Sequence, residues 1–171
     1  MHNTTHSTPA NGKFAWLRWL WISAIVIAVD LSTKYYFDST FQYGESRAVT
    51  PFFNWVLVYN PGAAFSFLAG AGGWQRWFFM VLTIIITAVL LWMLRANHSN
   101  RLLAAALVLV IGGAMGNLFD RVVHGHVIDF IQLHAAGYYW PAFNVADSAI
   151  CVGAVMLVVD SLRTPKAAPP A

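Results

Sequence analysis

The chain has 171 residues, of which 58% are hydrophobic and only 10% are charged. Ordinary soluble domains carry roughly 25% charged residues, so this composition argues against a water-soluble fold. The net charge of +3 comes from scattered lysines and arginines, which argues against nucleic-acid binding, and the single cysteine, Cys151, excludes an intramolecular disulfide framework.

The first apolar segment, at about residues 14–36, predicts a transmembrane helix that contains Asp30. A basic start with Lys13 and Arg18 before an apolar run is also typical of a cleavable secretory signal. No small-x-small cleavage site precedes the polar stretch at 30–34, so we expect this helix to be retained.

The connection after this helix contains FFNWVLVY at residues 52–59, which is rich in aromatic and β-branched side chains and predicts a strand. Asn60, Pro61 and Gly62 follow it and indicate a turn. The NPGAAF motif at 60–65 places glycine and alanine where another backbone can approach closely. Such a strand can pair with an extended peptide by strand addition.

Two charge-free apolar runs, at residues 77–94 and 102–119, predict the second and third transmembrane helices at about 75–94 and 102–120. A fourth apolar segment, at about 143–162, contains Asp147. We therefore expect an all-α membrane protein with four transmembrane helices and a small external β element, in a single domain that spans residues 1–171.

Basic residues mark three regions as cytoplasmic under the positive-inside rule. They flank the first helix, bracket the second connection and follow the fourth helix: Lys13, Arg18, Arg95, Arg101, Arg163 and Lys166. Both termini are therefore predicted to be cytoplasmic. The polar segment 1–12 and the Pro/Ala-rich segment 164–171 are predicted to be disordered tails.

Four aspartates are predicted to gather at one depth, near the external ends of the helices: Asp30, Asp120, Asp129 and Asp147. Ionisable groups at membrane depth are costly and usually face a cavity or a partner, so each is a candidate for a functional site. A purely structural alternative pairs Asp30 with Lys34 on one helical face, and Asp120 with the neighbouring Arg121.

An N-x-x-D spacing occurs at the end of the third helix and again at the start of the fourth. Asn117, Asp120 and Arg121 stand at i, i+3 and i+4, so they project from one helical face. The spacing recurs at Asn144 and Asp147. An amide three residues from a carboxylate can fix the orientation of that carboxylate by hydrogen bonding.

Two carboxylates held close together cannot both ionise easily, so one keeps a proton while the other acts as a base. The base can deprotonate a water that attacks an amide carbonyl, and the protonated member polarises that carbonyl and helps the amine leave. A pair of this kind can hydrolyse an amide bond without a metal and without a nucleophilic serine. Spacing alone leaves open which two of the four aspartates form the pair.

Four motifs, in this order, resemble the successive signatures of the lipoprotein signal peptidase (signal peptidase II) family. They are DLSTK at 30–34, NPGAAF at 60–65, GNLFDRVVHGHVIDF at 116–130 and PAFNVAD at 141–147. The resemblance covers roughly residues 29–152 and implies that Asp129 and Asp147 are the catalytic aspartates. It also implies a group of residues that support the site or contact substrate: Asp30, Lys34, Asn60, Gly62, Asn117, Asp120, Arg121 and Asn144.

The resemblance also implies a fold, a substrate and a location. Members of the family add a small extracytoplasmic β-cradle and a short extracytoplasmic helix or loop to their four helices, which we place at 52–59 and after Asp120. Their substrate is a prolipoprotein whose lipobox cysteine carries a diacylglyceryl group, and they cut on the amino side of that cysteine without a cofactor or a metal. They act in the cytoplasmic (inner) membrane of bacteria, contact membrane lipid and are inhibited by globomycin.

A Ser/Lys peptidase would use different residues of the same chain. Lys34 would activate Ser32, Ser66 or Ser148. The position of Asp30 beside Lys34 argues against this mechanism, because a neighbouring carboxylate favours the charged amine over the neutral base.

A metal site and a proton-coupled transporter would also explain part of the pattern. A zinc site would use His124, His126 and His134, although H-x-H lacks the H-E-x-x-H spacing of helical metalloproteases. A transporter would place carboxylates within helices, but the sequence shows no convincing internal repeat.

Overall fold

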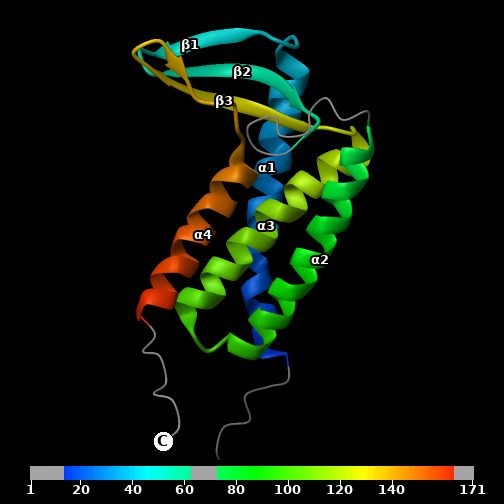
Figure 1. Ribbon diagram of the computed structural model, residues 1–171, viewed down its shortest axis with the longest axis vertical. Helices are drawn as coiled ribbons and strands as arrows, with labels where there is room; N and C mark the ends of the chain where they lie inside the picture. Colours follow the sequence, from blue (N-terminus) through cyan, green and yellow to red (C-terminus); the bar gives the residue numbers. More distant parts are fainter. Residues whose placement is uncertain (1–13, 63–72, 164–171) are drawn as a thin grey trace, which may run out of the picture.

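The computed structural model describes residues 14–62 and 73–163. Within these ranges, long helices form a bundle, and a small antiparallel sheet lies across one end of it (Figure 1). By length and composition, four helices can cross a membrane. The predicted tails at 1–12 and 164–171, and residues 63–65 of the NPGAAF motif, lie outside the described residues.

The helices agree with the apolar segments of the sequence to within a few residues. A short 3-10 helix, η1 (Ala15–Trp19), leads into α1 (Leu20–Thr40), and α2 spans Trp74–Asn97. The bundle is completed by α3 (Arg101–Val123) and α4 (Val145–Arg163). The largest difference is at the end of α1, which continues four residues past the predicted boundary through a stretch that is no longer apolar.

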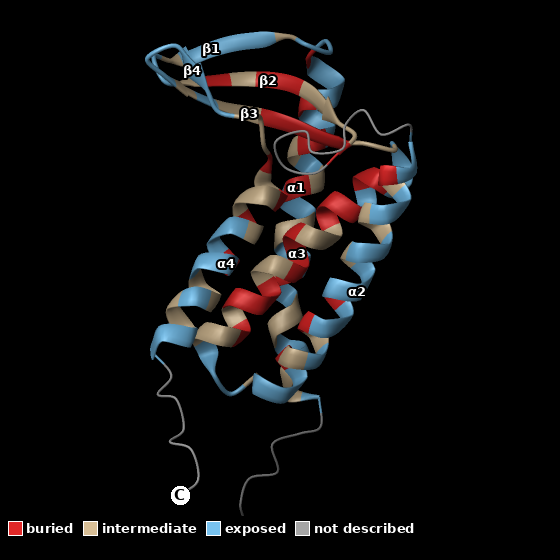
Figure 2. Ribbon diagram, in the orientation of Figure 1, coloured by how far each residue is buried: buried red, intermediate tan, exposed pale blue. Residues whose placement is uncertain are grey.

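Helix α3 is the centre of the bundle, since it packs against α1, α2 and α4. Of its most apolar stretch 56% is buried, compared with at most 17% for the corresponding stretches of the other helices. Figure 2 shows this as a band of buried residues along α3, beside helices whose outward faces are exposed. Those exposed faces are apolar and are the surfaces that lipid covers in a membrane.

Small residues let α1 and α4 approach α3 closely. A Cβ added at Gly112 would meet the backbone of Ser23 in α1, at 3.1 Å, and one added at Gly113 would overlap the carbonyl of Ala146 in α4. The buried Ser23 hydroxyl donates a hydrogen bond to the Val108 carbonyl over 2.7 Å. Backbone contact of this kind is typical of membrane helices, which associate by packing and hydrogen bonding without a hydrophobic driving force.

The sheet has the strand order β1-β2-β3-β4, and every pair is antiparallel. Its strands are β1 (Ser46–Thr50), β2 (Phe53–Asn60), β3 (Val127–Ala135) and β4 (Tyr138–Tyr139). The strand predicted at 52–59 is therefore confirmed as β2. The stretch after Asp120, for which a helix or loop was expected, finishes α3 and then forms β3.

Aromatic side chains fix the sheet to the end of α1. The rings of Phe37 and Phe130 stack with their centroids 4.4 Å apart, and Trp55 and Phe41 lie against Phe37 at 4.8 Å and 5.1 Å. Leu57 is fully buried in the same cluster. Phe130 directly follows Asp129 in β3. Packing of Phe130 in this cluster therefore fixes the position of Asp129 relative to the end of α1.

The pairing of β2 with β3 is irregular next to Asp129. Trp55 pairs with Ile131 and Val58 pairs with Asp129, so β2 contains one more residue than β3 across this interval. An extra residue of this kind bends its strand and re-aims the side chains around it, and such bulges are frequent beside active sites.

Candidate active site

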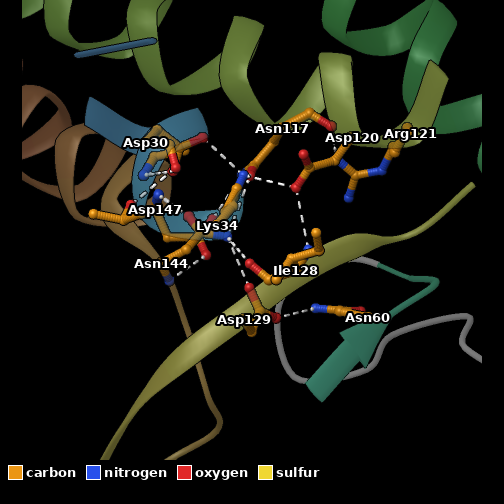
Figure 3. Close-up of polar contacts among 12 residues, drawn as sticks. Asp30, Lys34, Asn60, Asn117, Asp120, Arg121, Ile128, Asp129, Asn144 and Asp147 are labelled. Atoms are coloured by element: carbon orange, nitrogen blue, oxygen red, sulfur yellow. Dashed lines mark hydrogen bonds and ion pairs between the residues drawn. The ribbon is translucent and has the colours of Figure 1, made fainter. Parts of the chain in front are cut away.

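Every residue that the family resemblance implicates lies at the sheet end of the bundle, in one network of hydrogen bonds and ion pairs (Figure 3). The contributions come from α1, α3 and β3, from the start of α4 with the residue before it, and from the end of β2 with the turn that follows. Segments far apart in the sequence therefore meet at one place, as the shared depth of the carboxylates predicted.

Asp147 takes its position from the way in which α4 begins. Its backbone N–H donates to the Asn144 side-chain oxygen over 2.9 Å, and the Asn144 backbone N–H donates back to the Asp147 carboxylate over 3.2 Å. This reciprocal arrangement is a capping box, with Asn144 before the helix and Asp147 in its first turn. The N-x-x-D spacing noted in the sequence is thus a helix start that also orients a carboxylate.

Asp129 in β3 is held by two side-chain amides. Asn144 Nδ2 donates to Asp129 Oδ1 over 2.8 Å, and Asn60 Nδ2 donates to Oδ2 over 3.2 Å. Asp147 receives a further bond of 2.8 Å from Asn117 Nδ2. Asp129 and Asp147 therefore share Asn144, which binds one carboxylate through its side chain and the other through its backbone.

The environment of Asp129 disfavours its charged form. Burial, and then the negative charge of Asp147, raise the pKa of Asp129 from 3.8 to about 7, although Asn60, Lys34 and Asn144 act in the opposite direction. A carboxyl group with this pKa still holds its proton much of the time near neutral pH. A protonated carboxyl group near an ionised one can supply the acid and the base of a hydrolysis.

Lys34 is the centre of the buried charges beneath this pair. Its ammonium nitrogen lies 2.8 Å from a carboxylate oxygen of Asp30, 2.8 Å from one of Asp120 and 2.9 Å from the Asn117 side-chain oxygen. The predicted Asp30–Lys34 pair is confirmed. The predicted pairing of Asp120 with Arg121 is wrong, because Asp120 reaches across to Lys34 and also accepts the Ile128 backbone N–H over 3.1 Å.

Asp30 also connects the first long helix to the last. Its Oδ1 accepts the backbone N–H of Ala146, in the first turn of α4, over 2.8 Å. A carboxylate is favoured at a helix N-terminus, where backbone N–H groups have no partner within the helix. The opposing position on α3 is Gly116, where an added Cβ would overlap the Asp30 carboxylate.

Arg121 holds the turn that follows β2. Its Nη2 donates to the Gly62 carbonyl over 2.9 Å, and its Nη1 donates to the Asn117 carbonyl over 3.2 Å. The guanidinium also lies 5.3 Å from the centre of the Phe79 ring. This side chain therefore fixes the segment that carries Asn60, and through it one wall of the site.

A cleft of ≈ 210 Å³ opens beside Asp129, between β2, β3 and the segment that joins β4 to α4. It is lined by Val58, Tyr59, Asn60, Asp129, Gln132, Pro141 and Ala142. Sequence reasoning did not select Gln132. Residues three apart on a regular strand face opposite sides of the sheet, so the place of Gln132 three residues after Asp129 gave no signal that both line one cleft.

The geometry does not favour a Ser/Lys mechanism. An ammonium group has three N–H donors, and those of Lys34 bind Asp30, Asp120 and Asn117. Two of these partners are carboxylates, which favour the charged ammonium over the neutral amine that a Ser/Lys mechanism needs. Ser32 and Ser148 both donate their hydroxyls to helix carbonyls, and Ser66 lies outside the described residues.

The three histidines proposed for a metal do not converge. His134 stacks on Tyr139, with ring centroids 5.1 Å apart, at one end of β3. His126 lies at the other end of that strand against Tyr59, with ring centroids 4.2 Å apart. Across residues 14–62 and 73–163, no three histidine, cysteine or acidic side chains are grouped so that they could hold a metal ion.

Comparisons with known proteins point in one direction. The family described as Peptidase_A8, signal peptidase (SPase) II, matches residues 22–163. Proteins called lipoprotein signal peptidase are similar over most of the chain. The one from Cupriavidus necator is 56% identical over 147 residues, covering 86% of this chain and 84% of its own. The one from Pseudomonas putida is 50% identical over 165 residues, covering 95% and 96%.

Two solved structures, both described as bacterial membrane enzymes, share the fold. One has a TM-score of 0.78 and 33% identity, and the match covers 89% of this chain and 94% of that one. The other has a TM-score of 0.76 and 34% identity, with coverage of 86% and 94%.

Proposed function

The chain belongs to the signal peptidase II family and is a multi-pass bacterial membrane protein, and from that premise we propose that it is an aspartyl endopeptidase. Its substrates are diacylglyceryl-modified prolipoproteins, and it cuts on the amino side of the lipidated cysteine. Removal of signal peptides from prolipoproteins is what family membership implies. The aspartyl chemistry and the site of the cut are our proposal.

One observation carries the chemistry, namely that Asp129 and Asp147 are both bound to Asn144, and that Asp129 also lines a cleft. Shared hydrogen bonds fix the two carboxylates relative to each other before substrate arrives, which is what acid-base catalysis needs from its protein. Lys34 and its partners Asp30, Asp120 and Asn117 lie behind the pair and hold it in place.

The reaction starts with one proton on the pair. In the proposed reaction this proton is on Asp129, whose charged form burial and the charge of Asp147 disfavour. Asp147 is the base that takes a proton from water as the water oxygen attacks the scissile carbonyl. Asp129 donates to the developing oxyanion. When the C–N bond breaks, the amine nitrogen takes the proton that Asp147 accepted and Asp129 recovers its own, so the pair returns to its first state.

The positive-inside rule supports an orientation in the cytoplasmic (inner) membrane. Figure 1 shows that the start of α1, the α2–α3 turn and the end of α4 all lie at the end of the bundle opposite the sheet. These parts carry four arginines, namely Arg18 in η1, Arg95 and Arg101 on either side of the turn, and Arg163 at the end of α4. With that end in the cytoplasm, the sheet and the aspartates face the extracytoplasmic side. The scissile bond of a membrane-inserted signal segment, and the bound lipid, then meet the pair at the membrane surface.

The test compares wild-type protein with Asp129→Asn and Asp147→Asn in detergent, on a prolipoprotein with and without its diacylglyceryl group. Acid-base groups typically contribute about 10²- to 10⁴-fold, so each variant should lose at least about 10²-fold in kcat. Wild type should cut only the lipidated substrate. Globomycin, an inhibitor of the family, should compete with that substrate.

Asp160→Asn is the matched control, since it makes the same chemical change at the opposite end of α4 and should leave cleavage unchanged. Each variant must show the thermal unfolding of a folded protein. Near-normal cleavage by either Asp129→Asn or Asp147→Asn would contradict the proposed pair.

A further inference from the structure

The cleft beside Asp129 lies on the sheet and outside the helix bundle. Its volume of ≈ 210 Å³ is smaller than the roughly 300–1,000 Å³ of pockets that enclose a drug-sized ligand, so it suits a short stretch of extended chain. Asp129 stands where the cleft meets the bundle network, because its Oδ1 binds Asn144 of that network and its Oδ2 binds Asn60 in the cleft wall.

Gln132 is the polar side chain further along this cleft. It follows Asp129 by three residues on β3, which at about 3.3 Å per residue places it about 10 Å along the strand. An extended peptide that runs along β3 from a scissile bond at Asp129 would reach Gln132 two or three residues beyond the cut.

A chain of side-chain contacts sets which atoms Gln132 can offer. His134 Nε2 lies 3.2 Å from Asn54 Oδ1, and since that oxygen can only accept, His134 supplies the N–H. Asn54 is buried and its Nδ2 then faces Gln132, where it donates to Oε1 over 3.4 Å. With its oxygen used in this way, Gln132 presents its Nε2 as a hydrogen-bond donor.

We propose that Gln132 binds the part of the substrate that follows the cut, by donating from Nε2 to a main-chain carbonyl two or three residues beyond the scissile bond. This inference rests on the proposed function. The apolar signal segment stays with the helices, and the chain beyond the cut leaves the membrane and therefore reaches the sheet. A contact with backbone recognises extended conformation rather than a particular side chain, so this contact accepts many sequences.

The experiment compares two lipidated substrates, one that ends at the cysteine as an amide and one that extends four residues further. Gln132→Met removes the donor, and one hydrogen bond accounts for about 3- to 10-fold in affinity. The variant should raise the KM of the long substrate by that factor, with kcat unchanged, and should cut the short substrate as wild type does. Gln42→Met, an exposed position in the α1–β1 connection, is the matched control and should match wild type on both substrates.

Gln132→Glu provides a second variant, because a carboxylate still accepts from Asn54 but donates nothing. Gln132→Glu keeps the contact with Asn54 that Gln132→Met removes, so it tests the donor without the loss of that contact. It should raise the KM of the long substrate and leave the KM of the short substrate unchanged. The inference is wrong if the substitutions affect both substrates equally or affect neither. Failure of the proposed function would look different, because wild type itself would then leave both lipidated substrates uncut.

Discussion

Asn144 does more than any other single residue to define the site. Its side-chain oxygen caps α4, its side-chain nitrogen binds Asp129, and its backbone N–H binds Asp147. Asn144 thus orients Asp147 through the cap of α4, and it orients Asp129 through a side-chain hydrogen bond to β3. A change in the conformation of Asn144 would move both carboxylates together.

The raised pKa of Asp129 predicts how activity depends on pH. The pair needs one proton, and since burial raises the pKa of Asp129 to about 7, that proton is lost as the pH rises through this value. Two ionised carboxylates cannot polarise the scissile carbonyl. We therefore expect kcat to fall on the alkaline side with a midpoint near pH 7, measured with the lipidated substrate in detergent.

Asn60→Leu should move this midpoint upward. Asn60 donates to Asp129 Oδ2 and so favours the carboxylate, and removing this donor raises the pKa of Asp129 further. Asn97→Leu, which alters an exposed amide at the end of α2, should leave the midpoint in place. A downward shift in Asn60→Leu would mean that this amide does not favour the charged form of Asp129.

Single residues show how far the sequence predicted the site. The i, i+4 spacing predicted the Asp30–Lys34 pair correctly, because both residues lie on one helix. Spacing did not predict that Lys34 also binds Asp120, nor that Asn60 reaches Asp129, because these contacts join separate elements. Selecting Asp129 and Asp147 from four aspartates needed the family resemblance, and those two catalytic roles stay a prediction.

At the scale of elements, hydropathy predicted the helices and missed most of the sheet. A transmembrane helix has a long apolar run as its signal, whereas β1 and β4 are short and largely exposed. The strand β3 begins with Val127 to Phe130 all buried, so it lacks the alternation that marks a strand with one exposed face. The paired strand β2 was found because its turn residues and aromatic content are local signals.

The close packing of α3 against Asp30 predicts that one added methyl group, in Gly116→Ala, lowers both stability and activity. A Cβ at Gly116 overlaps the Asp30 carboxylate, so Gly116→Ala must displace the group that caps α4 beside Asp147. Overpacking of this kind costs about 1–3 kcal/mol. We expect a lower unfolding temperature in detergent together with a marked loss of kcat.

Gly137→Ala separates these two effects. Gly137 lies in the β3–β4 turn with φ +82, and a Cβ added there would meet nothing within 4 Å, so alanine costs backbone strain of about 1–2 kcal/mol and touches no site residue. It should lower the unfolding temperature slightly and leave kcat unchanged. If Gly116→Ala kept full activity, the Asp30 cap would not be needed to place Asp147.

For the whole molecule, the proposed orientation can be tested with single cysteines. In a Cys151→Ser background, Tyr139→Cys puts a thiol on the sheet and Ser161→Cys puts one at the far end of α4. A membrane-impermeant maleimide should label the first in intact spheroplasts and the second only after permeabilisation. The reverse pattern would place the aspartates on the cytoplasmic side.

The hydrogen bond from Ala146 to Asp30 joins residues 116 positions apart, and so links the first long helix to the last. During synthesis Asp30 and Lys34 enter the membrane long before α4 exists. Asp147 and Asn144 arrive only with the final helix, and they take their places against partners that are already inserted. On the proposed mechanism the protein is therefore inert until α4 is in place, and we expect a chain truncated before Asn144 to have no peptidase activity in the membrane.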